Sequence, residues 1–338
     1  MRVTQSIADR LYHKNNNRML ANMLKNQTRI YTGKQYTRAS QDSINASKAM
    51  GVRRQLRDLD MYDSNLTTAD GYYKAAETNL YTVAHDIYLN LSTKLEAACN
   101  GSYSADDRNI FAREMEEFGD LILETMNSDY AGRQVFGGSN TSTVPFSKQL
   151  VTQADGTEKY EVFYNGVNVN SAAALDAFPG NKPVYVDVGM GIQYNDNYEV
   201  DPQTALDISL NGAEITGFGK ASDKNGEYNS NIIQMVYDAA EALKNNDVEG
   251  ANAYLDRLYN ANSKVLTHIT TLGAKQNRVE FYTSRNEDYR YSLLERQNDV
   301  EGCDMNKEIT DYEATRAAYQ AILQMSSNIL PRSIFDFI

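Results

Sequence analysis

The chain has 338 residues, of which 41% are hydrophobic, and it carries a formal net charge of −12 at pH 7. This composition excludes global disorder, and the acidic balance argues against nucleic acid as a main partner. No apolar run approaches the ~20 residues that a membrane-spanning helix needs. Two cysteines, Cys99 and Cys303, are too few for a disulfide framework and are interpreted as small packed hydrophobes.

The charge is unevenly distributed. Residues 1–65 carry 12 basic against 5 acidic residues, whereas residues 66–271 carry 13 against 29. The basic N-terminal segment can attract acidic helices of the same chain or of another subunit, and such a segment is also typical of membrane-surface proteins. The first residues lack the apolar core of a secretory signal peptide, so we expect a cytoplasmic protein or one exported by another route.

Proline and glycine positions divide the chain. None of the five prolines precedes Pro145 or lies between 203 and 330, and 12 of the 20 glycines lie between Gly132 and Gly226. Because these residues mark turns and interrupt helices, the sequence predicts a mainly α protein with a β-rich insertion. Both chain ends are expected to form one elongated antiparallel helical bundle, a coiled-coil rod.

The N-terminal half is predicted to be almost entirely helical. A helix over residues 3–31 opens with Val3, Ile7 and Leu11, and Gly33 is expected to cap it. A further helix from about residue 43 gains heptad-like apolar spacing between Leu66 and Leu91. The next helix is predicted to start at a capping box, and its apolar positions are Ile110, Met115, Phe118, Leu121, Ile122 and Thr125.

Short alternating runs characterise residues 140–228. The run 160–164 precedes Asn165-Gly166, which predicts a hairpin, and a second strand is expected over 184–188. Helical spacing returns at about residue 230, with a tight connection over 245–247.

The stretch from Leu272 to Leu330 runs for 59 residues without a proline. Its apolar residues recur at intervals of three and four, which predicts a helical seam that needs a partner helix. The seam loses phase near Gly302 and Asp304, which indicates a local break. The first stripe is Leu272, Val279, Tyr282, Asn286, Tyr289, Leu293, Val300 and Cys303; the second is Ile309, Tyr312, Tyr319, Leu323 and Leu330.

No motif for chemistry is found. The three histidines, His13, His85 and His268, lie in different predicted helices, without a nucleophile or an acid at catalytic spacing. The carboxylates of 196–201 lack the glycine and glutamate of an EF-hand loop. The sequence therefore predicts no enzyme activity, no cofactor and no metal site.

Four stretches carry a resemblance to a known family. They are the start 1–6, the run 30–46, the block 127–146, and residues 272–280 together with the tail 329–338. In this order they resemble the bacterial flagellin superfamily, over about the first 146 and the last 70 residues. The Phe136-Gly-Gly block and the tail look more like the hook-filament junction branch than like flagellin. Ala39 and Gln41 depart from the family pattern at one turn.

The resemblance implies a structural subunit of the bacterial flagellum that joins the hook to the filament and templates flagellin assembly through its helical termini. Implied partners are copies of itself, another hook-associated protein, flagellin and an export chaperone, with no nucleic acid and no membrane. The implied location is the extracellular flagellum, reached by the flagellar type III route without a cleaved signal peptide. The alternatives are flagellin itself, a helical membrane-surface adapter, and an enzyme housed in the insertion.

On this basis the chain is divided into an assembly segment 1–42, a rod 43–139, a surface insertion 140–228, the returning rod 229–302 and a second assembly segment 303–338. We expect burial of apolar stripes on the two assembly segments to drive assembly. The predicted interface residues are Val3, Ile7, Leu11, Ile309, Tyr312, Tyr319, Leu323, Ile329, Leu330, Ile334 and Phe335.

Overall fold

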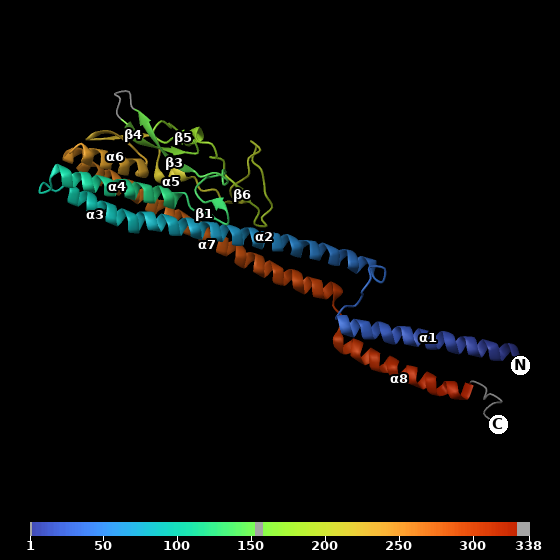
Figure 1. The fold of residues 1–338 in the computed structure, drawn as a ribbon. Coiled ribbons are helices and arrows are strands. Elements are labelled where there is room, and N and C mark those ends of the chain that lie inside the picture. Colours follow the sequence, from blue (N-terminus) through green and yellow to red (C-terminus); the bar gives the residue numbers. More distant parts are fainter. Residues whose placement is uncertain (1, 153–157, 330–338) are drawn as a thin grey trace. The chain divides into compact units, whose positions relative to one another are not determined.

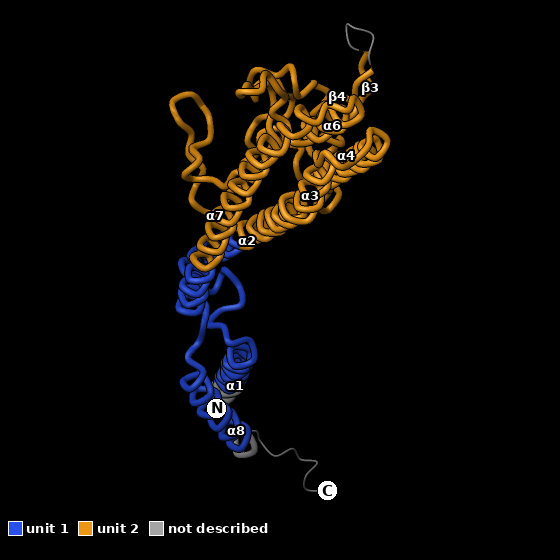
Figure 2. Tube along the Cα trace, turned by 90° about the vertical axis from the view of Figure 1, so that its left-hand side faces the viewer, with its two compact units in different colours: residues 1–59, 287–338 blue, residues 60–286 orange. Residues whose placement is uncertain are grey.

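The computed structural model describes residues 2–152 and 158–329. The chain forms two compact units: a terminal unit of residues 1–59 and 287–338, and a central unit of residues 60–286 (Figure 2). Long helices from both chain ends dominate the described residues, and short strands lie in the insertion between them (Figure 1). The predicted fold class, mainly α with a β-rich insertion, is confirmed.

The helices follow the predicted order. They are α1 (Arg2–Thr32), α2 (Ser43–Tyr81), η1 (Thr82–Ile87), α3 (Tyr88–Ala98), α4 (Ala105–Met126), α5 (Gly212–Thr216), α6 (Ile232–Lys244), α7 (Val248–Glu301) and α8 (Met305–Ile329), with a short 3₁₀ turn η2 (Leu175–Ala177). Gly33 has φ +66° and its N–H donates to the Arg29 carbonyl at 2.8 Å, which ends α1 as expected. Asp42 starts α2 by accepting the Asn45 N–H at 3.0 Å.

Helices α2 and α7 run antiparallel through the central unit. The predicted apolar series from Leu66 to Leu91 is buried, as are Leu272, Val279 and Tyr282 on α7. Gln276 donates to Glu77 at 2.8 Å and Asn286 to Asp63 at 3.2 Å, which fixes the alignment of the two helices. In the central unit α2 is therefore a partner helix of the first part of the seam.

One part of this helix pair was not predicted. Between α2 and α3 the chain forms a π-helical turn, η1, in which Val83, Ala84 and Ile87 are buried. The wider turn redirects a carbonyl, and the buried Asn262 of α7 donates to Ala84 O at 3.2 Å. Sequence periodicity cannot reveal such a turn, because the apolar spacing on both sides of it is that of an ordinary helix.

Helices α4 and α6 pack closely against each other. Ser104 and Asp107 form the expected capping box at the start of α4. Cβ at Gly119 would lie only 2.7 Å from the Tyr237 ring, so the absence of a side chain lets the two helices meet there. The predicted apolar face of α4 is partly wrong, since Ile110 is 60% and Leu121 46% exposed. The buried side turns instead through Ala112, Met115, Gly119, Ile122 and Met126.

Small antiparallel sheets lie between α4 and α6, most of them in the insertion. The strands are β1 (Asp129–Tyr130), β2 (Arg133–Gln134), β3 (Phe146–Thr152), β4 (Glu158–Tyr164), β5 (Val167–Asn168), β6 (Tyr185–Val186), β7 (Leu206–Asp207), β8 (Lys220–Asp223) and β9 (Gly226–Asn229). β4 and β5 form the predicted hairpin at Asn165-Gly166, whose φ values are +46° and +82°. The 184–188 run pairs instead with distant β7 over only two residues.

The break in the long seam lies where the phase shift predicts it. α7 ends at Glu301 and α8 begins at Met305. One detail of the seam is wrong: Tyr289 is 47% exposed, while Asn286 and Leu293 on either side of it are buried. Its ring lies beside the packed stripe rather than in it.

Candidate assembly interface

The terminal unit contains a pair of helices formed by the two chain ends. α1 and α8 lie side by side and contact each other (Figures 1 and 2). Half-buried residues recur every three or four positions on each helix, as expected for a coiled-coil seam. The α1 stripe is Tyr12, Asn16, Met19, Met23, Asn26 and Ile30, and the α8 stripe is Tyr312, Thr315, Tyr319 and Ile322.

This seam is incompletely covered. Among the described side chains of α1 none is fully buried, and on the described part of α8 only Glu308 is. Polar contacts are few: Arg29 pairs with Glu308 at 2.8 Å, and Asn26 donates to Thr315 at 3.4 Å. Two helices alone cannot bury an apolar face on all sides. The pair thus leaves apolar surface exposed in the single chain.

A polar cluster holds the base of this pair, where residues 33–36 cross residues 301–303. Lys34 and Gly302 form a β-bridge, and Gln35 N–H donates to Glu301 O at 2.8 Å. The Glu301 carboxylate is buried at 3% exposure and pairs with Arg53 at 2.6 Å and Lys34 at 3.2 Å. Burial acts to raise the pKa of Glu301, but the two cations outweigh it and hold this pKa below its usual range.

The structure places the predicted interface residues in three groups. Tyr312 and Tyr319 lie half-buried in the α8 stripe. Exposed side chains are those of Ile7 (53%), Leu11 (59%), Ile309 (45%) and Leu323 (44%). Val3 and Ile329 lie in the described backbone of α1 and α8, and Leu330, Ile334 and Phe335 lie outside the described residues. The single chain does not bury Ile7 and Leu11, so their role at an interface between subunits stays a prediction.

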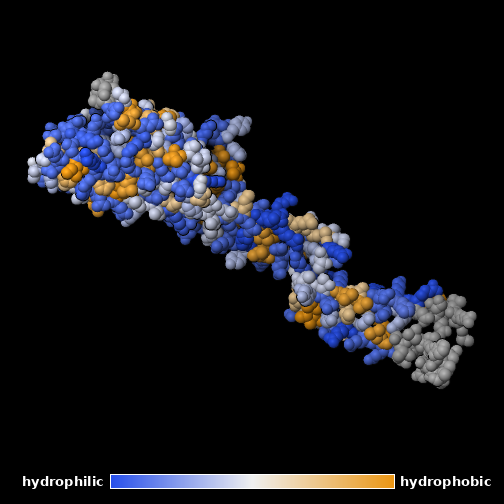
Figure 3. Space-filling model, in the orientation of Figure 1, coloured by the Kyte–Doolittle hydropathy of each residue, from blue (hydrophilic) through white to orange (hydrophobic). Residues whose placement is uncertain are grey.

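Further exposed apolar side chains lie outside the predicted set of interface residues. Leu24 and Tyr31 on α1 are 50% and 92% exposed, and Met305 and Met325 on α8 are 40% and 59% exposed. In Figure 3, hydrophobic surface is interspersed with hydrophilic surface along this helix pair. In the sequence, such residues are found by considering every apolar position of the two terminal helices, and not only the positions on one stripe.

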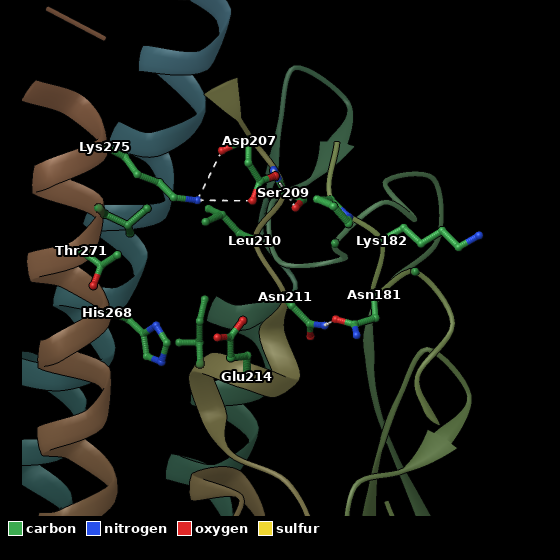
Figure 4. Close-up of a pocket in the computed structure, with 15 residues that line it drawn as sticks. Asn181, Lys182, Asp207, Ser209, Leu210, Asn211, Glu214, His268, Thr271 and Lys275 are labelled. Atoms are coloured by element: carbon green, nitrogen blue, oxygen red, sulfur yellow. Dashed lines mark hydrogen bonds and ion pairs between the residues drawn. The ribbon is translucent and has the colours of Figure 1, made fainter. Parts of the chain in front are cut away.

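The central unit contains a polar cavity of about 330 Å³ beside α7 (Figure 4). Several of its polar groups bond to one another: Lys275 donates to Asp207 O at 3.3 Å, Ser209 donates to the Asp207 carboxylate at 2.6 Å, and Asn211 donates to Asn181 at 2.7 Å. His268 and Glu214 also line this cavity. Among the described residues, no group of three His, Cys, Asp or Glu side chains could hold a metal ion.

Three comparisons bear on the class of protein. A family model described as the bacterial flagellin N-terminal helical region matches residues 3–141. Flagellar hook-associated protein 3 of Escherichia coli is 26% identical over 327 residues, which are 94% of this chain and 93% of the relative. A flagellar filament 33 kDa core protein of Treponema phagedenis is 22% identical over 297 residues, covering 88% and 85%.

A solved structure agrees in fold. FlgL from Xanthomonas campestris is 15% identical, with a TM-score of 0.52, over 73% of this chain and 99% of that chain. In its fold and its paired terminal helices the chain therefore resembles a flagellin-type helical subunit. Over nearly its full length the chain is similar to flagellar hook-associated protein 3, as the terminal motifs indicated. No helix among the described residues is long and apolar enough to cross a bilayer.

Proposed function

We propose that this protein is a structural subunit of the bacterial flagellum that joins the hook to the filament. The observation that carries this function is the near full-length similarity to flagellar hook-associated protein 3, which includes both helices of the terminal pair. The incompletely covered α1–α8 seam provides the physical basis. A helix pair with exposed Ile7, Leu11 and Ile309 gains stability only when neighbouring subunits cover it.

The subunit contacts copies of itself, another hook-associated protein on the hook side and flagellin on the filament side. It is exported by the flagellar type III system with the help of a chaperone, acts outside the cell, and catalyses no reaction. We further propose that 1–42 and 303–338 are the assembly segments, that 43–139 with 229–302 form the supporting helices, and that 140–228 is the surface insertion.

Electron microscopy of cells that lack the protein tests the junction role. We expect hooks without filaments and flagellin shed into the medium, because filament subunits then have no surface on which to assemble. Complementation with the wild-type gene serves as the control. Normal filaments on hooks in the deletion strain would refute the junction role.

Filament subunit is the second candidate function, because a filament core protein of Treponema phagedenis is also similar over 88% of the chain. The same micrographs separate the two functions. Loss of a filament subunit removes filament mass and leaves no abundant shed flagellin. Immunogold labelling adds a direct measure: a junction subunit labels only a narrow band at the end of the hook, whereas a filament subunit labels the whole filament.

A further inference from the structure

The outer side of α1 carries a basic face in the terminal unit. α1 contains six basic residues and one acidic residue. Lys14, Arg18 and Lys25 are exposed and recur at intervals of four and seven, which places them on one side of the helix, away from the half-buried stripe. None of these three cations has an ion-pair partner among the described residues. Exposed Ile7 and Leu11 extend the same side.

The last turns of α7, in the same unit, carry a face of opposite charge. Asp288, Glu295 and Asp299 are exposed and recur at intervals of seven and four. Within the described part of the chain these carboxylates also lack ion-pair partners. Tyr291, 73% exposed, lies on the same side of the helix between the first two acids.

The two faces match in register. In an antiparallel helix pair the residue numbers of facing positions have a constant sum, so Lys14 faces Asp299, Arg18 faces Glu295 and Lys25 faces Asp288 in one alignment. All three cations then meet an acid. The same alignment sets the Tyr291 ring opposite Asn22, which is exposed. The short Asn22 side chain leaves room for the ring, and its amide can hydrogen-bond the phenol hydroxyl.

The faces of one chain cannot meet each other. α1 ends at Thr32 and α7 ends at Glu301, and within the terminal unit α1 and the last turns of α7 extend from the Gln35–Glu301 hydrogen bond in opposite directions (Figure 1). A second copy of the chain supplies the missing face. An anionic membrane would use the basic face but would leave the matched acidic face unexplained.

We propose that the basic face of α1 docks antiparallel on the acidic face of the end of α7 in a neighbouring copy. This inference rests on the proposed function, since it specifies how copies of the subunit contact one another. Because the two faces differ, the contact is heterologous and propagates from copy to copy, as a ring or a helical array requires. The charges steer the copies into register, and the Tyr291 ring adds contact area.

Charge reversal tests the pairing. The triple variants K14E/R18E/K25E and D288K/E295K/D299K each place like charges in contact, and we expect the fraction of hooks with filaments to fall by about tenfold or more. A single chain that carries all six substitutions is complementary to itself again and should restore filaments. If the six-substitution chain is no better than either triple variant, the proposal is wrong.

Crosslinking provides a second measurement that does not depend on the reversed variants folding well. In a C99S/C303S background, R18C and E295C are placed in separate tagged copies that are co-expressed and isolated in assembled flagella. Mild oxidation should link the two tags. The matched control pairs R18C with E313C, another exposed acidic position, and should give no link. Equal linking in both pairs, or none with E295C, overturns the proposed register.

Three further outcomes separate the possible sources of error. If wild-type protein binds phosphatidylglycerol vesicles, K14E/R18E/K25E abolishes this binding, and the six-substitution chain does not restore filaments, then the basic face serves a membrane and the proposal fails. If cells without the protein still bear filaments on their hooks, the proposed function fails first. If they need the protein but accept both triple variants, only the docking surface is refuted.

Discussion

At the scale of single residues, Glu301 ties together the segments that join the two helix pairs. Its carboxylate binds Arg53 and Lys34, and its carbonyl accepts the Gln35 N–H, so one residue connects α2, the 33–42 connection and α7. Such a role is not visible in the sequence, where Glu301 is one of several acids near the end of a predicted helix. The sequence located the break near Gly302, but not the side chain that organises it.

Glu301→Gln should lower the stability of this crossing by about 1–2 kcal/mol at pH 7, because the buried carboxylate pairs with two cations that remain partly solvated. The folded-state pKa of Glu301 is lower than the unfolded value, so its contribution is complete above the unfolded pKa and is lost as the pH falls through the folded pKa. Hydrogen exchange of the Gln35 amide measures the difference between wild type and variant, which should shrink in acid. A difference that grows in acid contradicts this assignment.

At the scale of elements, the helices of the chain ends were predictable because proline and glycine exclude helix only in the middle and because heptad spacing persists over long runs. The sequence did not predict which side of α1 faces its partner helix. Val3, Ile7 and Leu11 form the apolar stripe that the sequence shows first, yet the half-buried side runs through Tyr12, Met19 and Met23. α1 carries two apolar stripes, and only the partner helix decides which of them is covered.

The insertion was predictable only at its local hairpin, because β6 and β7 pair across a long intervening loop.

The contact between α4 and α6 gives a prediction at this scale. Gly119→Ala should lower the free energy of unfolding by about 1–3 kcal/mol, since its Cβ would come within 2.7 Å of the Tyr237 ring, and overpacking outweighs the gain in helix propensity. Gly51→Ala in α2 is the matched control, because no atom lies within 4 Å of its Cβ position. It should be neutral or stabilise by up to about 1 kcal/mol. Urea denaturation of both variants checks the pair, and equal effects would show that close packing at Gly119 is unimportant.

The exposed side of α1 gives a second prediction. Leu11→Glu should weaken assembly by about 1–2 kcal/mol per contact without lowering the thermal stability of the isolated subunit, because Leu11 is 59% exposed before assembly. Leu66→Glu is the contrasting control: its side chain is 1% exposed, so this variant should unfold at a markedly lower temperature. Melting curves and filament counts are the two readouts. A large loss of stability in Leu11→Glu would place that residue in the core of the subunit.

At the scale of the whole molecule, the two units differ in how they are stabilised. The central unit contains nearly all of the continuous apolar core, from Leu66 through Tyr282. The terminal unit relies on a half-covered seam and on the Glu301 cluster. This division suits a subunit whose central unit must be stable alone and whose terminal unit gains its partners on incorporation.

Removal of residues 323–338 should therefore separate folding from assembly. The deletion shortens α8 after Ile322 and also removes the predicted interface residues Leu323, Ile329, Leu330, Ile334 and Phe335, while every contact of the central unit remains. We expect the main thermal transition to stay within a few degrees of the wild-type value, because each 1 kcal/mol shifts a domain of this size by about 2–4 °C. Hydrogen exchange should show faster exchange in α1 and in the rest of α8, which lose part of their seam, and unchanged protection in α4 and α6.

Cells that carry only the truncated protein should have hooks without filaments. If they still build filaments, the C-terminal segment is not required for assembly, and the apolar surface of the α1–α8 pair serves another purpose.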